Sequence, residues 1–465
     1  MTTREIIENT LLPAVQIEGQ PLTGMNLHDR MAYYRVPGIS IAVVNNGHIE
    51  WSQGYGLVEA GAGKPITPQT LFQAASISKP VSALAAMALV QAGLLELDRD
   101  VNEVLKSWQV PPNEFTEKEK VTLRRLLSHN AGLTVHGFEG YREGAPLPTV
   151  QQVLLGAPPA NSPPVVVDVL PGSIWRYSGG GTTVAQLMMM EATGLPYHEI
   201  MRRYVLEPAG MLRSTYEHPL PAARRGEPAI AHNQAGEPIA GGWHTYPEQG
   251  AASLWTTPED LCRYIIELQK SWHGQSNKIL SQEWTREMLS VQFANWGIGP
   301  KISGTGDAVA FSHGGSNAGY RCEMIGFIHT GQGIAVMTNS DNGGSLVMEV
   351  IRAAASVYGW QDYLPALKKA IELPAAELKN FVGKYTFPEF AEVPFEIVLV
   401  DNRLCYNSQP FNLQENQPLF AQSPNSFFDA ESGFEFDFAA ADKGLEMTLR
   451  VSEMEFKAHK NEEPG

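Results

Sequence analysis

The stretch "FQAASISKPVSALAAMALVQAG" (Phe72–Gly93) carries the pattern that decides the fold. From Val81 to Leu95 the residues are apolar almost all round, and a helix without a polar face is a buried helix. Ser76 and Lys79 stand just before this segment, where a loop runs into the helix. The pattern therefore predicts a central buried helix with a serine and a lysine, three residues apart, at its amino end.

Strand signals lie far to either side of this helix. Residues 38–56, "GISIAVVNNGHIEWSQGYG", alternate apolar residues around Asn46-Gly47, which predicts a β-hairpin. Residues 307–343 hold three strand-like runs joined by short turns, typical of an antiparallel meander, and residues 100–240 read as helices with Pro-rich loops. We therefore expect an α+β domain, an antiparallel sheet flanked by helices, with an α-helical insertion between its two parts.

The C-terminal part is different in kind. Residues 361–374 read as a linker with helical character, and residues 375–465 as a small all-β domain suited to an antiparallel barrel or curled sheet. The clearest alternation there is at Phe434, Phe436 and Phe438, and at Leu445, Met447, Leu449 and Val451. The predicted organisation is a domain over 1–360, a linker over 361–374 and a β-domain over 375–465.

Composition excludes several classes of partner. The chain has 465 residues, 43% of them hydrophobic, which is enough for two cores. Acidic residues outnumber basic ones by 50 to 34, for a net charge of -16, and no Lys/Arg run is long enough to track phosphates. We therefore expect neither nucleic acid nor an anionic membrane as a partner.

The amino terminus has no apolar run of signal-peptide length, and no window approaches the roughly 20 apolar residues of a membrane span. Three scattered cysteines, Cys262, Cys322 and Cys405, favour reduced core thiols over a disulfide framework or a zinc site. The sequence therefore predicts a cytoplasmic protein.

Ser76 and Lys79 have the spacing of a nucleophile and its activator. Positions i and i+3 share a helix face, so the Lys79 amine projects toward Ser76 Oγ. Burial would lower the pKa of Lys79 and make it a usable base, and the free N–H of Ser76 could accept negative charge developing on a carbonyl oxygen. Alone, this motif fits an N-cap serine followed by a solvated lysine better.

Two further segments favour the catalytic reading. "WRYSGGGTTV" places Tyr177-Ser178-Gly179 in a Gly-rich loop before a helix, and "FSHGGSNAGYRC" places His313-Gly314-Gly315 at the end of a strand. In this order, and with the phrases "LLSHNAGL" and "AASLWTTPEDL", residues 25–360 resemble the serine hydrolases related to class C β-lactamases, penicillin-binding proteins, D-aminopeptidases and family VIII esterases.

The resemblance implies a role for each motif. Ser76 would be the acylated nucleophile, Lys79 would share or relay its proton, and Tyr177, as phenolate or through Lys79, would be the base that activates water. Cationic Lys79 would lower the pKa of Tyr177 from its ordinary value near 10. The oxyanion hole would be the backbone N–H groups of Ser76 and Ser316.

Two departures from the family pattern concern substrate binding, which the resemblance assigns to His313, Gly314, Gly315 and Gly179. Gly179 stands where many relatives have an asparagine that holds an acyl-amide group. His313 replaces a lysine, and a largely neutral imidazole is a poorer anchor for a carboxylate than an ammonium. Both changes favour esters or small amides over penicillins.

Other catalytic routes lack support. No G-x-S-x-G elbow is present, "YHEIMRRY" is not HExxH, and the histidines have no ligand spacing, so we expect neither a metal nor a cofactor. His129 is expected to be structural, near the carboxyl end of a helix.

The sequence therefore predicts a serine hydrolase that acts through an acyl-serine intermediate on a small ester, amide or short peptide, with a lipocalin-like β-domain. Relatives with such a domain suggest that it borders the cleft or mediates homo-oligomer formation. A D-amino-acid-specific peptidase and a weak β-lactamase stay open as alternatives in the same chemistry, and a non-catalytic penicillin-recognising scaffold as one of another class.

Overall fold

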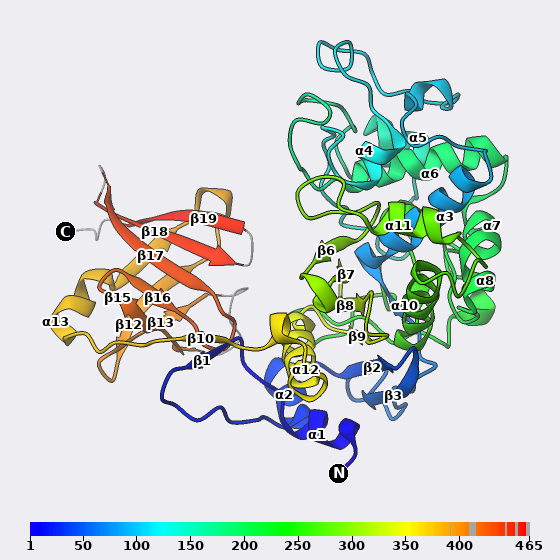
Figure 1. Ribbon diagram of the computed structural model, residues 1–465. Helices are drawn as coiled ribbons and strands as arrows, with labels where there is room; N and C mark the ends of the chain where they lie inside the picture. Colours follow the sequence, from blue (N-terminus) through cyan, green and yellow to red (C-terminus); the bar gives the residue numbers. More distant parts are fainter. Residues whose placement is uncertain (391, 409–414, 442–443, 452–453, 462–465) are drawn as a thin grey trace. The chain divides into compact units, whose positions relative to one another are not determined.

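The computed structural model describes residues 1–390, 392–408, 415–441, 444–451 and 454–461. It forms two compact units, which are treated separately below (Figure 1). Residues 31–347 make up the first, here called the α+β unit. Residues 1–30 and 348–465 make up the second, here called the barrel unit.

A six-stranded sheet organises the α+β unit, with strand order β3-β2-β9-β8-β7-β6 and antiparallel pairing throughout. Its strands are β2 (Gly38–Asn45), β3 (His48–Gly56), β6 (Lys301–Ser303), β7 (Ala310–Asn317), β8 (Tyr320–Phe327) and β9 (Gly333–Thr338). Because β2 pairs with β9, for instance Ile39 with Thr338, strands that lie far apart in the chain form one sheet. The predicted antiparallel sheet is confirmed.

The hairpin between β2 and β3 is also confirmed. Asn46 and Gly47 have φ of 51° and 73°, the left-handed region that a tight two-residue turn requires at both central positions. Gly47 N–H donates to the Gly331 carbonyl, which ties this turn to the one between β8 and β9.

The central helix is α3 (Ser78–Gln91), and every residue from Ser78 to Val90 is buried. Further helices lie between β3 and β6, as the predicted insertion requires: α4 (Leu123–Leu127), α5 (Val150–Leu155), α6 (Gly179–Thr193), α7 (Tyr197–Met201), α8 (Glu207–Ala209), α9 (Gln249–Ala252), α10 (Pro258–Trp272) and α11 (Gln282–Leu289). The amphipathic α10 packs on β2 and β9, and so covers one face of the sheet.

The barrel unit contains a nine-stranded antiparallel sheet in the order β14-β13-β12-β11-β19-β18-β17-β16-β15. Its strands are β11 (Gly383–Thr386), β12 (Phe395–Val400), β13 (Arg403–Asn407), β14 (Gln417–Pro418), β15 (Phe420–Ser423), β16 (Ser426–Phe428), β17 (Glu435–Ala441), β18 (Gly444–Val451) and β19 (Met454–Lys460). The two edge strands are separated by Leu419 alone, so the sheet curls into a nearly closed barrel (Figure 1).

Aromatic side chains fill the interior of this barrel. Phe436 and Phe438 are buried on β17, as their alternation predicts, and Met447 and Leu449 are buried on β18. Phe395 stacks on Tyr406 with ring centroids 5.7 Å apart. The barrel is therefore a packed hydrophobic core.

The amino terminus contributes to the same unit. β1 (Val15–Ile17) pairs in parallel with β10 (Ala366–Lys368), and Val15 and Ile17 pack on Phe428. The short helical turns η6 (Gln361–Tyr363) and α13 (Ala375–Leu378) stand on either side of β10. The segment predicted as a linker thus holds a strand.

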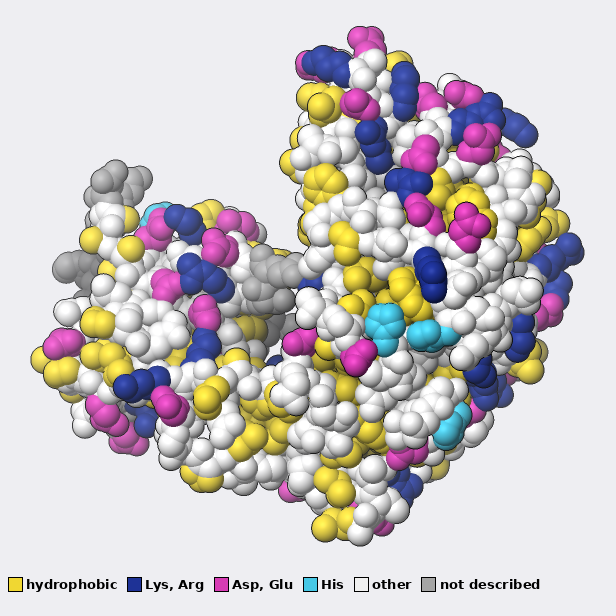
Figure 2. All heavy atoms as spheres, viewed as in Figure 1, with side chains coloured by type: hydrophobic (Ala, Val, Ile, Leu, Met, Phe, Trp, Pro, Cys, Tyr) yellow, Lys and Arg dark blue, Asp and Glu magenta, His cyan; other side chains and the backbone are white. Residues whose placement is uncertain are grey.

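Acidic and basic side chains are interspersed over the face seen in Figure 2. Among the described helices, none is long and apolar enough to cross a membrane. The three cysteines are free and buried, as predicted.

Candidate active site

Ser76 lies on a tight turn between a short strand and the central helix. β4 (Phe72–Gln73) pairs with β5 (Trp255–Thr256) and leads into the 3₁₀ turn η1 (Ala75–Ile77). Ala75 has a φ of 48°, which is costly for a residue with a side chain and is typical of functional sites. Ser76 is partly exposed between two buried neighbours, so its hydroxyl is accessible.

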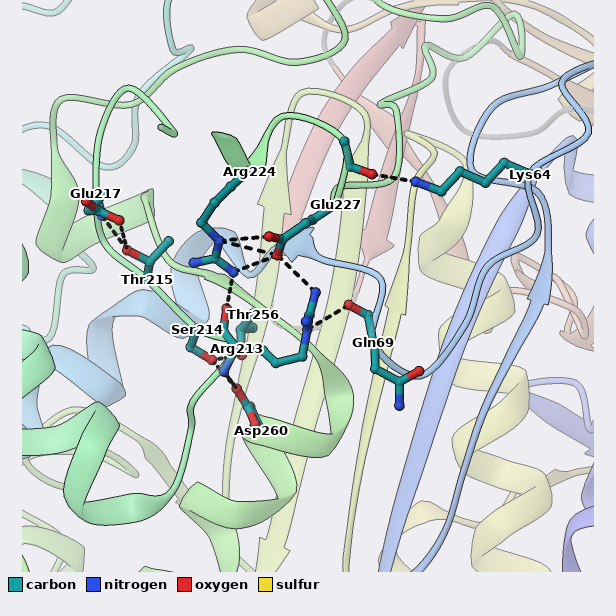
Figure 3. Close-up of polar contacts among 11 residues, drawn as sticks. Lys64, Gln69, Arg213, Ser214, Thr215, Glu217, Arg224, Glu227, Thr256 and Asp260 are labelled. Atoms are coloured by element: carbon teal, nitrogen blue, oxygen red, sulfur yellow. Dashed lines mark hydrogen bonds and ion pairs between the residues drawn. The ribbon is translucent and has the colours of Figure 1, made fainter. Parts of the chain in front are cut away.

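A polar network braces the strands that lead to Ser76 (Figure 3). Ser214 Oγ lies 2.7 Å from Thr256 Oγ1 on β5 and donates to Asp260 Oδ2 at 2.8 Å. Glu227 pairs with Arg213 at 2.9 Å, and its carbonyl accepts the N–H of Leu71, next to β4. These contacts hold β4 and β5 in place, and so fix the turn that carries Ser76.

Lys79 is buried and directed at the serine. Only 4% of Lys79 is exposed, and its Nζ donates to Ser76 Oγ at 2.9 Å and to the Ala251 carbonyl at 3.0 Å. Burial lowers the pKa of Lys79 from 10.5 to about 7. A substantial fraction of Lys79 is therefore neutral near pH 7 and able to accept a proton.

Tyr177 lies beside the same lysine. Lys79 Nζ is 4.9 Å from the centroid of the Tyr177 ring, and Tyr177 Oη is 3.5 Å from His313 Nε2. Burial raises the pKa of Tyr177 above its ordinary value, and a hydrogen bond with Ser76 opposes that rise. The expectation that the pKa of Tyr177 lies below its ordinary value is therefore wrong, because burial dominates.

Aromatic and imidazole rings surround Tyr177. Its ring centroid lies 4.3 Å from that of His129, 4.9 Å from that of His136 and 5.9 Å from that of Trp296. Burial, and then the nearby Lys79, lower the pKa of both histidines. Tyr177 thus sits in a pocket of neutral rings that limits access of water.

His129 also orients the loop that carries the tyrosine. It follows the carboxyl end of α4, as expected, and its Nδ1 accepts the N–H of Ser178 at 3.2 Å. Ser178 in turn caps α6, its Oγ accepting the Gly181 N–H at 2.9 Å. These contacts fix Tyr177 at the start of a helix.

Strand β7 approaches the serine turn closely. A Cβ on Gly315 would lie 2.3 Å from the Ala74 carbonyl oxygen and 2.4 Å from Cys322 Sγ, so this position requires glycine. Asn317 Nδ2 donates to Gln73 Oε1 at 2.6 Å. The strand therefore passes directly beside the segment that ends at Ser76.

His313 and Ser316 occupy different positions on this strand. His313 is buried, with Nδ1 2.6 Å from the Gly314 carbonyl oxygen, whereas Ser316 is exposed. Burial, assisted by the nearby Lys79, lowers the pKa of His313 to about 3. His313 is thus neutral across the physiological range and carries no charge that could hold a carboxylate.

Gly179 is the first residue of α6 and is buried. A Cβ there would lie 3.0 Å from Phe138 Cε2 and 3.1 Å from the His136 carbonyl oxygen. A larger side chain would need this loop to shift. Gly179 follows Tyr177 by two residues, and it packs against the loop that contains His136 and Phe138.

The structure thus brings Ser76, Lys79, Tyr177 and His313 together, with Gly314, Gly315 and Ser316 on the adjoining strand. Sequence reasoning missed the Ala251 carbonyl, which holds Lys79, and the rings around Tyr177. The apolar segment around Ala251 can be recognised in the sequence, but no residue type indicates which backbone carbonyl will accept a hydrogen bond. Within the described ranges, no group of three or more His, Cys, Asp or Glu side chains could hold a metal ion.

Comparison with known proteins gives consistent relatives. Residues 26–358 match the family model for beta-lactamase. The chain is 26% identical to Esterase EstB of Burkholderia gladioli over 304 residues, which span 57% of this chain and 74% of the esterase.

Solved structures share the fold. The octameric penicillin-binding protein homologue from Pyrococcus abyssi superposes with a TM-score of 0.64 at 22% identity and covers 93% of this chain and 98% of its own. The D-amino acid amidase from Ochrobactrum anthropi SV3 has a TM-score of 0.57 at 22% identity, over 72% of this chain and 95% of its own. With the family model matching well over half of the chain, this protein belongs to the beta-lactamase family.

Proposed function

We propose that this protein is a serine hydrolase that forms an acyl intermediate on Ser76 and acts on a small ester or amide. The observation that carries the proposal is the contact of 2.9 Å between Lys79 Nζ and Ser76 Oγ, made by a buried lysine whose pKa is about 7. A neutral amine at this distance can remove the hydroxyl proton. The esterase and amidase among its relatives favour ester and amide substrates over other acyl compounds.

The first step is acylation. Neutral Lys79 takes the proton of Ser76 as the bond between Oγ and the substrate carbonyl carbon forms. The backbone N–H groups of Ser76 and Ser316 donate to the carbonyl oxygen as it becomes negative. The intermediate then breaks the carbon–oxygen or carbon–nitrogen bond to the leaving group, which receives the proton from Lys79.

Hydrolysis of the acyl-enzyme completes the cycle. Water attacks the acyl carbon, its proton passes to Tyr177 or through it to Lys79, and the bond to Ser76 Oγ breaks as that oxygen regains a proton. Since burial raises the pKa of Tyr177, we assign the base in the free enzyme to Lys79. Tyr177 then acts as a hydroxyl that relays the proton.

The proposal is tested by labelling and by turnover. A fluorophosphonate probe should label the wild-type protein and fail to label Ser76→Ala, while the matched control Ser173→Ala, at an exposed serine, should label normally. Labelling that persists in Ser76→Ala would contradict the assignment of the nucleophile. If the wild-type protein is not labelled and does not hydrolyse nitrophenyl esters, D-aminoacyl amides or a chromogenic cephalosporin, the non-catalytic scaffold is favoured.

Three substrate classes separate the alternatives. We expect nitrophenyl esters to be hydrolysed with a higher kcat/KM than a chromogenic cephalosporin, because His313 is neutral and Gly179 has no side chain to hold an acyl-amide group. D-aminoacyl amides test the peptidase alternative, which the fold likeness to the D-amino acid amidase favours. A kcat/KM highest for the cephalosporin would contradict the ester preference.

We also propose that the protein forms a homo-oligomer, since the full-length structural neighbour from Pyrococcus abyssi is octameric. Light scattering should then give a mass that is a multiple of 50.9 kDa. A monomeric mass across a range of protein concentrations would contradict this.

A further inference from the structure

The side-chain positions of Tyr177 and Gly179 lie on one side of the chain. Ser178 between them is extended, with φ of -140° and ψ of 111°, and successive side chains of an extended segment point in opposite directions. The Tyr177 ring faces Lys79, whereas Ser178 Oγ points away and donates to the Thr134 carbonyl at 2.7 Å. The side-chain position of Gly179 is therefore directed to the same side as the catalytic tyrosine and lysine.

Phe138 occupies the space beside Gly179. A Cβ on Gly179 would lie 3.0 Å from Phe138 Cε2 and 3.5 Å from Phe138 Cδ2, so the edge of the ring stands where a side chain at position 179 would be. Phe138 is half-buried, and it packs on a cluster of three residues, Tyr246, Ala251 and Ala252. The Ala251 carbonyl is the one that holds the catalytic lysine. The ring thus lies between the tyrosine loop and α9.

The loop that carries Phe138 is tied to the tyrosine loop. The His136 carbonyl accepts the N–H of Gly179 at 3.0 Å, and the His136 ring centroid lies 4.9 Å from that of Tyr177. Burial, and then Lys79, lower the pKa of His136, so its imidazole is neutral near pH 7. Neither the phenyl ring nor the imidazole ring of this loop carries a charge there.

The same loop is held on its other side next to strand β7. The Tyr246 ring lies against Gly140, where a Cβ would come within 2.5 Å of Cζ of that ring. Tyr246 Oη accepts the N–H of Ala318 at 3.0 Å, two residues after Ser316, the proposed oxyanion donor. The position of Phe138 is therefore fixed relative to both the tyrosine and the end of the strand.

We propose that Phe138 is a specificity-determining residue that selects substrates with an apolar chain beside the scissile bond. The inference deepens the proposed function and rests on it. The chain would lie on the exposed face of the Phe138 ring while the reacting carbonyl faces Ser76. An apolar chain gains free energy when it leaves water for such a ring, whereas a polar group would lose its water without finding a partner.

The test uses two ester series that differ only in chain length. The first keeps the nitrophenyl leaving group and carries an acetyl, butyryl or hexanoyl group. The second keeps the acetyl group and carries methyl, butyl or hexyl alcohol, because either end of a substrate can bear the chain, and its hydrolysis is followed by titration of the acid. Wild type, Phe138→Gln, Phe138→Leu and the control Phe115→Gln, at a half-buried phenylalanine of another loop, are compared.

The quantity compared is the ratio of kcat/KM for the longest and the shortest ester of a series. In one series wild type should favour the longest ester by about tenfold or more, and Phe138→Gln should remove most of this preference. Phe138→Leu should keep most of it, and Phe115→Gln should not change it. The ratio does not depend on the fraction of folded protein, so it separates specificity from stability. Equal ratios in wild type and Phe138→Gln in both series would overturn the inference.

A binding measurement separates this outcome from failure of the proposed function. Affinities of the longest and shortest ester of each series for the Ser76→Ala variant, with and without Phe138→Gln, are measured by calorimetry. Selective loss of affinity for a long-chain ester supports the role of Phe138 even if no ester is turned over, and equal affinities with and without Phe138→Gln overturn it. Absence of turnover in wild type together with this selective loss would count against the hydrolase and not against the role of Phe138.

Discussion

Asp429 in the barrel unit and Glu248 in the α+β unit are both buried carboxyl groups, but their hydrogen-bond environments are opposite. Asp429 in the barrel is 2% exposed and accepts hydrogen bonds from Tyr406 Oη at 3.2 Å, Gln417 Nε2 at 3.0 Å and Ser432 Oγ at 2.5 Å. Glu248 in the α+β unit is 0% exposed, and neither of its carboxyl oxygens has a hydrogen-bond partner in the described part of the chain.

The two carboxyl groups therefore differ in their expected effect on stability. A buried polar group with several donors specifies a single packing, whereas an unpaired one lowers stability. Lys79 in the α+β unit also lowers stability, since burial disfavours its charged form and holds its pKa at about 7. Ionisable groups kept at such a cost are typical of catalytic sites, where stability is exchanged for reactivity.

The largest expected effect is that of Lys79→Met. Without the amine, Ser76 has no base, and kcat/KM for a nitrophenyl ester should fall by about 10³-fold or more. Lys118→Met, at an exposed lysine, is the control. Retention of more than a tenth of wild-type activity would assign the base elsewhere.

The same variant should be more stable than wild type. Because the folded-state pKa of Lys79 is below 10.5, the cost of burial is largest below about pH 7 and disappears as pH rises toward the unfolded value. Lys79→Met should therefore raise the free energy of unfolding by about 2–4 kcal/mol at pH 6, and by much less at pH 10. Urea denaturation at the two pH values measures this, and an equal gain at both would contradict it.

Asp429→Ala should destabilise the barrel unit. It leaves the donors of Tyr406, Gln417 and Ser432 without an acceptor inside the barrel, which should lower the free energy of unfolding by about 3 kcal/mol. Glu372→Ala, at an exposed residue of the same unit, should change it by less than about 0.5 kcal/mol. A neutral result for Asp429→Ala would mean that its hydrogen bonds do not stabilise the barrel.

Glu248→Gln should raise the free energy of unfolding, opposite to the effect of Asp429→Ala. Burial raises the pKa of Glu248 to about 7, so its cost is absent below the unfolded value of 4.5, grows as pH rises and is complete above about pH 7. The variant should gain roughly 2 kcal/mol at pH 8 and little at pH 4.5. Destabilisation at pH 8 would show that Glu248 has a partner that compensates its charge.

The last prediction concerns the pH dependence of wild-type hydrolysis. Below pH 7, kcat/KM should fall about tenfold per pH unit as Lys79 becomes protonated, with an apparent pKa near 7 that belongs to the coupled Lys79 and Tyr177 pair. A pH–rate profile from pH 5 to 10 measures it. A midpoint near 10 would mean that burial does not lower the pKa of Lys79, and would contradict its role as the base near pH 7.

The sequence predicted those features that depend on local spacing. The three-residue separation of Ser76 and Lys79 fixes their shared helix face, and Asn46-Gly47 has the turn chemistry of a hairpin. Strand and helix periodicity predicted the sheet and the barrel because burial on one face imposes it. Parallel pairing of β1 with β10 could not be predicted, since two three-residue strands about 350 residues apart leave no periodic signal.

Features that depend on contacts between residues far apart in the sequence could not be predicted either. The direction of the Tyr177 pKa follows from how completely its ring is enclosed, which His136 and Trp296 decide from separate loops. The fit of Gly315 against the Ala74 carbonyl and Cys322 Sγ likewise depends on how closely β7 approaches the serine turn.

The pairing of β2 with β9 has a consequence for synthesis on the ribosome. Strand β2 emerges early, yet its partner ends at Thr338, and the glycine that fits against Ala74 is residue 315. A nascent chain therefore carries its serine for most of translation without the neighbours that would make it reactive. Under the proposed function, chain order alone would prevent acylation of an unfinished polypeptide.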